Sequence, residues 1–170
     1  MCFSNTEIER AGSLTSGEAE DTVYEPISST SDRSGTQAMM DHLFATIEKD
    51  GWTLESAESR HARHPETFEI PSRAEREALT PGDGAQLIFD IETREAGHVS
   101  DRGSDRLWVI VKKKLDGLYI GVLDSDPGAA EGLTLRQGVE ILFAPEHVIA
   151  IDRPPDGYVL EKFGDSFFRD

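Results

Sequence analysis

Three groups of polar side chains in this sequence have residue types that could do chemistry. The first is the adjacent pair Glu146 and His147, which could act as a general acid and base. The pair follows Ala144-Pro145 and precedes the apolar run Val148-Ile149, so it lies at a corner that leads into a strand. Because adjacent side chains on an extended segment point in opposite directions, the spacing favours a surface corner over an acid–base pair.

The other two groups could hold a metal ion. Asp124 and Asp126 resemble the opening of a calcium loop, but the later oxygen ligands, central glycine and distal glutamate of an EF-hand do not follow. A turn whose aspartates accept backbone N–H bonds explains them better. His61 and His64 are three residues apart, yet Pro65 disfavours a helix at His64 and no further ligand completes a set. We therefore expect no metal and no cofactor, and a solvated loop around the two histidines.

Composition limits the classes of partner. The chain has 170 residues, with 17 Lys and Arg against 33 Asp and Glu, and a formal net charge of −16. This charge repels phosphate backbones, which argues against direct nucleic-acid binding, and it steers the protein toward a basic protein partner. Solubility, or adaptation to a salty cytoplasm, is the alternative explanation of the acidity. A single cysteine, Cys2, and the lack of a signal sequence or apolar span predict a cytoplasmic protein without membrane contact.

The sequence pattern divides the chain into a polar N-terminal segment and one domain. Residues 1–34 have no sustained apolar period, so we expect a disordered or loosely docked acidic tail, followed by a single domain over 35–170. Within the domain, apolar residues recur at helical spacing from Met39 to Ile47, and Gly51 ends the helix. The alternating run Trp52–Ala57 then predicts a strand.

A short second helix and a series of strands follow. Ser72 and Glu75 form a capping box that starts a helix ending near Leu79. Apolar runs separated by Gly-Asp, Asp-Gly and Asp-Pro-Gly turns predict strands at Ala85–Glu92, Arg106–Val111, Leu118–Leu123, Val139–Phe143 and Val148–Ile151.

Four finer expectations concern these strands. Ile88 is expected on a mostly wet face of its strand, opposite the core. Residues 93–104 are expected to form a charged loop, and a hairpin is expected to close near Asp116-Gly117. Gly121 in mid-strand predicts a bulge or a close approach by another backbone or an aromatic ring. The fold class is α+β: a strongly bent, barrel-like antiparallel sheet of about five to six strands, with one amphipathic helix packed on it and a short second helix.

The order of these blocks resembles a known family. The similarity is carried by Phe68-Glu69-Ile70-Pro71, Glu75–Leu79, Gly82-Asp83, Ala85–Phe89, Arg106–Val109, Tyr119–Pro127 and Pro145–Val148. Over about residues 68–152 the chain resembles the bacterial YegJ-like domains of unknown function, which are similar to immunity-protein domains found beside polymorphic toxins. The resemblance implies a small α+β domain with a bent antiparallel sheet. It implies no established activity and assigns no functional residues.

Three functional interpretations follow. The first is a non-enzymatic binding module, immunity-like, that engages a basic protein through an acidic surface, with Trp108 or Tyr119 as an aromatic anchor if exposed. Its candidate contact residues are Trp108, Tyr119, Asp124, Asp126, Glu146 and His147. The second is a small-ligand sensor with a site between the first helix and the sheet. The third is a hydrolase that brings His147 together with nearby carboxylates and Arg106. The sequence does not indicate an oligomeric state.

Overall fold

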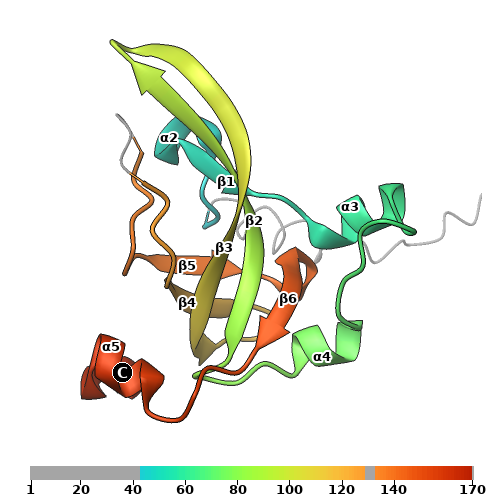
Figure 1. Ribbon diagram of the computed structural model, residues 1–170, viewed down its shortest axis with the longest axis vertical. Coiled ribbons are helices and arrows are strands. Elements are labelled where there is room, and N and C mark those ends of the chain that lie inside the picture. Colours follow the sequence, from blue (N-terminus) through green and yellow to red (C-terminus); the bar gives the residue numbers. More distant parts are fainter. Residues whose placement is uncertain (1–42, 129–132, 170) are drawn as a thin grey trace, which may run out of the picture.

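A computed structural model describes residues 43–128 and 133–169 and shows an α+β fold around a curled antiparallel sheet (Figure 1). The strands are β1 (Trp52–Leu54), β2 (Gly84–Glu95), β3 (His98–Lys114), β4 (Tyr119–Leu123), β5 (Glu140–Phe143) and β6 (Val148–Asp152). The helices are α2 (Ile47–Asp50), α3 (Ala57–Arg63), α4 (Arg73–Glu77), α5 (Tyr158–Phe163) and the 3-10 turns η1 (Pro145–His147) and η2 (Asp165–Phe168).

The sheet is organised around its long second strand. The strands follow the order β1-β2-β3-β4-β5, and β6 returns to pair with β2. Since β1 pairs with the part of β2 around Phe89–Ile91 and β6 with the part around Gly84–Leu87, both lie along the same edge of β2. The sheet thus curls into a half-barrel, which confirms the predicted fold class.

Alternation along the strands builds the core inside this curl. Leu87, Phe89 and Ile91 face inward as expected and pack with Val109 and with residues of the other strands. Gly121 is confirmed as a point of close approach, because a Cβ atom there would lie 2.8 Å from the backbone carbonyl oxygen of Ile110 and 3.2 Å from Cε1 of Phe143. The same Cβ atom would also lie 2.3 Å from Cγ1 of Val109, an approach that the prediction did not include. A side chain at this position would therefore force the neighbouring strands apart.

The outer face of the sheet is more buried than expected. Ile88 is 1% exposed, so the prediction of a wet face around it is wrong. It packs with Ala57 at the start of α3 and with Ile149 of β6, and the connecting segment adds Phe68 and Ile70. Farther along, α5 and η2 cover Ile110 and Val122 of the same sheet. The two outer clusters make the sheet the middle layer of the fold.

The prediction of a charged loop over residues 93–104 is wrong, because this segment forms the far end of a long hairpin. In Figure 1, β2 and β3 continue together well beyond the rest of the sheet. The turn is made by Ala96 and Gly97, both with positive φ (50° and 81°), the conformation of a tight two-residue hairpin. At its base the 4%-exposed Glu92 pairs with Arg94 and Arg102. These side-chain bonds, chiefly from Arg94 and then Arg102, lower the pKa of Glu92.

The N-terminal part of the domain differs from the prediction in its boundaries. The first described helix, α2, starts only at Ile47, after the N-cap Thr46, and ends at Gly51 (φ 77°) as expected. The earlier residues of the predicted helix, 39–42, and the predicted tail, 1–34, lie outside the described residues. The strand β1 stops at Leu54, because Ser56 caps the following helix α3.

The two histidines lie at this helix, not in a loop. His61 is within α3 and His64 caps its end. Nδ1 of His61 lies 2.6 Å from the carbonyl oxygen of Phe68, so the ring ties the helix to the segment that follows. Among residues 43–128 and 133–169, no three His, Cys, Asp or Glu side chains gather as a metal site would require. None of the helices in these ranges has the length and hydropathy of a transmembrane span.

Candidate binding site

A groove of about 430 Å³ lies between α4, the β3–β4 turn and η1. Its apolar lining comes from Leu118 and Tyr119 at the start of β4 and from Pro145 of η1. Its charged lining consists of Glu58, Arg73, Glu77, Lys114 and Glu146. A concave apolar surface with a few charged groups is the usual form of a binding site.

Local sequence places α4 beside this groove. Ser72 accepts a hydrogen bond from the backbone N–H of Glu75, and the carboxylate of Glu75 accepts one from the backbone N–H of Ser72 at 2.9 Å, which confirms the predicted capping box. The hydroxyl and backbone of Ser72 lower the pKa of Glu75. The helix ends at Glu77, not at Leu79 as predicted. Leu79 itself is buried in the core and anchors this end of the helix.

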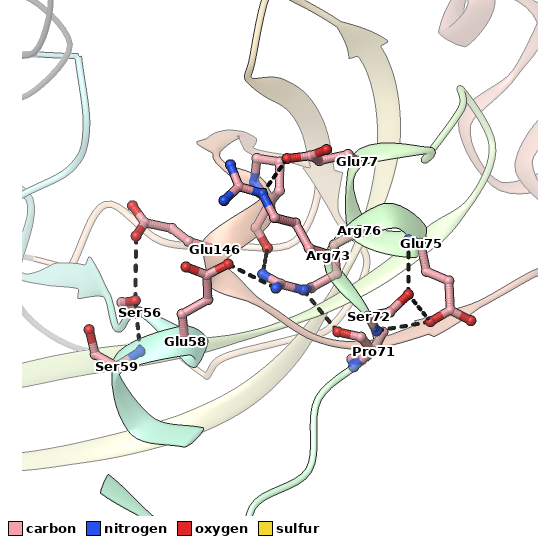
Figure 2. A network of polar contacts seen from close by, with 11 residues as sticks. Ser56, Glu58, Ser59, Pro71, Ser72, Arg73, Glu75, Arg76, Glu77 and Glu146 are labelled. Atoms are coloured by element: carbon pink, nitrogen blue, oxygen red, sulfur yellow. Dashed lines mark hydrogen bonds and ion pairs between the residues drawn. The ribbon is translucent and has the colours of Figure 1, made fainter. Parts of the chain in front are cut away.

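Arg76 joins the walls of the groove. Its side chain is 4% exposed, and Figure 2 shows it at the centre of a polar network. Its Nε donates to the carbonyl of Pro71 at 3.0 Å, Nη1 donates to Pro145 at 2.8 Å, and Nη2 pairs with Glu58 at 2.8 Å. The hydroxyl of Tyr119 donates to the carbonyl of Arg76 at 3.0 Å. One guanidinium therefore holds α3, α4 and η1 in fixed relation around β4.

The charges on the rim differ in how far they are already paired. Arg73 pairs with Glu77 at 2.7 Å, an interaction that raises the pKa of Arg73. The ammonium of Lys114 donates to the backbone carbonyl of Glu77. Glu146 is 50% exposed, and its nearest polar contacts are the hydroxyl of Ser56 at 3.5 Å and Nε2 of His147 at 3.9 Å. Glu146 is thus the rim carboxylate with the weakest contacts.

His147 stabilises the corner instead of taking part in an exposed acid–base pair. Its ring is buried, and Nδ1 accepts a hydrogen bond from the backbone N–H of Ala144 at 2.9 Å. Burial lowers the pKa of His147, and the nearby carboxylate of Glu146 only partly offsets this effect. The ring is therefore neutral near pH 7 and accepts at Nδ1. The predicted corner is confirmed by η1, but only Glu146 lies on the surface there, because His147 is buried.

The remaining predicted residues lie at the other end of β4. Asp124 follows Leu123, and its carboxylate pairs with the ammonium of Lys162 and accepts a hydrogen bond from the hydroxyl of Tyr158 at 2.9 Å. The bond to Asp124 is the main cause that raises the pKa of Lys162. Asp124 thus attaches α5 to the sheet.

Neighbouring Asp126 behaves as a turn residue. Its Oδ1 accepts a hydrogen bond from the backbone N–H of Gly128 at 2.9 Å, which confirms the aspartate-turn prediction for Asp126. The prediction is wrong for Asp124, whose carboxylate instead binds the side chains of Tyr158 and Lys162. Trp108 lies beside this turn, where its backbone N–H donates to the hydroxyl of Ser125 at 2.9 Å, and it is half-buried.

The candidate residues therefore fall into two separate groups. Tyr119, Glu146 and His147 gather near the groove, whereas Trp108, Asp124 and Asp126 gather at the opposite end of β4. Tyr119 is 1% exposed, so it is not available as an aromatic anchor, which has to be exposed to contact a partner. Neither Asp124 nor Asp126 lines the groove that holds Glu146.

Sequence reasoning missed the residue that organises the site. Arg76 was not distinguished from Arg73, although the two arginines are three residues apart on one short helix. Helical spacing does not separate the two arginines, because Arg73 precedes Arg76 by the same three residues by which Arg76 precedes Leu79, and the helix ends at Glu77.

The comparisons with known proteins do not add a family to this geometry: no protein-family model, curated protein or solved structure matches the chain.

Proposed function

We propose that this protein is a non-enzymatic binding module that engages a basic protein partner through its acidic surface, with the groove beside α4 as the contact site. An immunity-like role is the form of this function that the family resemblance suggests. The observation that carries the proposal is an apolar groove with a half-exposed carboxylate at its rim, that of Glu146, which makes only weak contacts with the described residues.

The groove suits a lysine or arginine side chain of the partner. Such side chains bury an apolar stem while the charged end stays in contact with polar groups. Here the stem would lie along Leu118 and Pro145, and the cationic end would meet Glu146. Because Glu146 has no strong partner within residues 43–128 and 133–169, little of the described interaction is lost when it binds a cation.

The charge of the whole chain supports the same class of partner. A net charge of −16 attracts a basic surface over long range and raises the rate of association. The groove then supplies the short-range contact that charge alone does not give. Affinity should accordingly fall as the salt concentration rises.

The test is calorimetric titration with the peptide acetyl-Gly-Arg-Gly-Arg-Gly-amide. We expect Glu146→Gln to weaken binding by about three- to tenfold, since it removes one rim charge without changing the shape of the groove. The matched control is Glu161→Gln, which removes the same charge from exposed α5 and should leave the affinity unchanged. Equal weakening in both variants would show that only net charge matters, and an unchanged Glu146→Gln variant would exclude the groove.

A small-ligand sensor is the second candidate, and the size of the groove favours it. A volume of 430 Å³ falls within the range of small-molecule sites. Titration with free arginine separates the two functions. A sensor for a small cation would bind free arginine at least as tightly as the peptide, whereas a protein-binding groove should prefer the peptide. The hydrolase interpretation gains no comparable support, because Asp124 and Glu146 lie at opposite ends of β4.

A further inference from the structure

The arm formed by residues 92–95 and 98–107 has a free sheet edge. In this arm β3 pairs with β2 on one side, while its pairing with β4 begins only at Val109. Every residue of β3 from His98 to Arg106 is exposed. Figure 1 shows the arm projecting from the body on the side away from α4, so this edge is separate from the groove.

The direction of the backbone groups along this edge follows from the pairing at its base. The carbonyl of Trp108 accepts from the backbone N–H of Asp124 at 2.8 Å, so Trp108 turns its backbone groups toward the β4 side. Backbone groups of alternate residues in a strand point the same way, which places those of Ser104 and Arg106 on that side as well. Among the described residues, no backbone or side-chain group pairs with the main-chain N–H and C=O of Ser104 and Arg106. Within the described part of the chain, the edge therefore offers a ladder of unused donors and acceptors.

Acidic side chains flank this ladder. Asp101, Gly103 and Asp105 line a hollow of about 300 Å³ together with Pro127 and Leu133. Asp105 has no ion pair with any described residue, whereas the arginines beside it are engaged: Arg102 with Glu92, and Arg106 over the ring of Phe68. Over residues 90–107, five acidic side chains face three arginines, so the net charge of the arm and its base is negative.

A second copy of the chain fits this edge poorly. When two copies of β3 pair antiparallel about a two-fold axis, residues the same number of positions before and after the axis lie opposite each other, one from each copy. An axis at Gly103 opposes Asp101 to Asp105, and an axis at Ser104 opposes Arg102 to Arg106. An axis at any of these four charged positions opposes that residue to its own copy in the partner. Like charges directly opposite destabilise a sheet, so the edge resists self-pairing.

We propose that the free edge of β3 binds an extended, basic segment of another protein, which adds to the sheet as a further strand. Main-chain hydrogen bonds to Ser104 and Arg106 supply the attachment, and lysine or arginine side chains that face Asp101 and Asp105 supply the selectivity. This surface is additional to the groove and does not depend on it.

The test uses hydrogen exchange of single amides followed by NMR, with acetyl-Lys-Val-Lys-Val-Lys-Val-Lys-amide as the probe. We expect the peptide to slow exchange at Ser104 and Arg106 by about tenfold or more, because their N–H groups become hydrogen-bonded. Gly103 and Asp105 are internal controls, since their N–H groups already point toward β2. The acidic peptide with Glu in place of Lys should produce no slowing.

Two further measurements make the proposal refutable. A probe with N-methylated backbone amides on its pairing side keeps its charge but cannot form the ladder, and it should lose the effect. Ser104→Pro removes one outward N–H donor and no backbone bond to β2, and it should weaken binding of the Lys probe. Because Pro also loses the hydrogen bond of the Ser104 hydroxyl to Asp90, Ser104→Ala, which loses only that bond, is the matched control and should bind the probe normally. The proposal would be overturned if the Lys probe bound without slowing exchange at Ser104 and Arg106, or if the methylated probe bound equally well. It would also be overturned if a higher protein concentration alone slowed exchange, because a second copy would then occupy the edge.

Discussion

Replacing Arg76 should destabilise the protein far more than replacing Arg73, although both arginines lie on the five-residue helix α4. Arg76 is 4% exposed and bonds Pro71, Pro145 and Glu58, whereas the side chain of Arg73 is 76% exposed and pairs with Glu77. The contrast separates a buried structural cation from a surface one within the same element.

The expected magnitude comes from the groups that lose their donor. Arg76→Ala leaves the carbonyls of Pro71 and Pro145 without a partner, at a cost of about 1–2 kcal/mol each. Glu58 is 42% exposed and regains water, so its loss adds little. The sum is about 2–4 kcal/mol, which corresponds to a decrease in melting temperature of roughly 6–12 °C for a chain of this length.

Urea unfolding followed by far-UV circular dichroism measures this difference. Arg76→Met keeps the apolar stem but removes the donors, so it should lose most of the same stability as Arg76→Ala. Arg73→Ala should leave the free energy of unfolding nearly unchanged, since exposed ion pairs contribute little. A stable Arg76→Met variant would show that packing of the stem matters and not the hydrogen bonds, and equal losses at positions 73 and 76 would refute the interpretation of Arg76 as the central contact.

Three other outcomes are expected. Gly121→Ala should lower the free energy of unfolding by about 2–3 kcal/mol in urea titrations, because its Cβ would overlap Val109; a neutral effect would contradict the tight packing. Burial lowers the pKa of His147 in the folded state, whereas in the unfolded chain this histidine has the ordinary pKa of about 6.5. Below that pH the unfolded chain therefore binds more protons than the folded one, and the free energy of unfolding should fall from pH 7 to pH 5.5. The contribution of His147 to this pH dependence should disappear in His147→Gln. Asp124→Asn should release α5, which binds Asp124 through Tyr158 and Lys162, and amide exchange in α5 should then accelerate while β2 stays protected.

Local signals made much of the fold predictable. Alternation of apolar residues indicated β2 and the strands that follow it, and the pair Ser72 and Glu75 indicated the start of α4. Gly51 and Gly117 occur with positive φ at the helix end and the hairpin that the sequence predicted. In each case the deciding interaction lies within a few residues of the signal.

The errors arose where distant parts of the chain determine the outcome. The sequence predicts a loop for the arm because its residues are exposed on both faces and show no alternation of apolar and polar side chains. Pairing with β2 nevertheless extends β3 through this segment. Ile88 is buried because α3 and its connection, more than 15 residues earlier in the chain, cover it. Arg76 is fixed by Pro145, a contact across 69 positions that no local pattern records.

The proposed function requires a cationic side chain to bind in the groove beside α4. The most direct measurement is a map of amide chemical shifts during titration with acetyl-Gly-Arg-Gly-amide, a probe too short to form a strand. The proposal predicts that the largest changes occur at Leu118, Glu146 and Glu58, and that they vanish in Glu146→Gln but persist in Glu161→Gln. Changes spread over the acidic surface, or concentrated on α5, would contradict it.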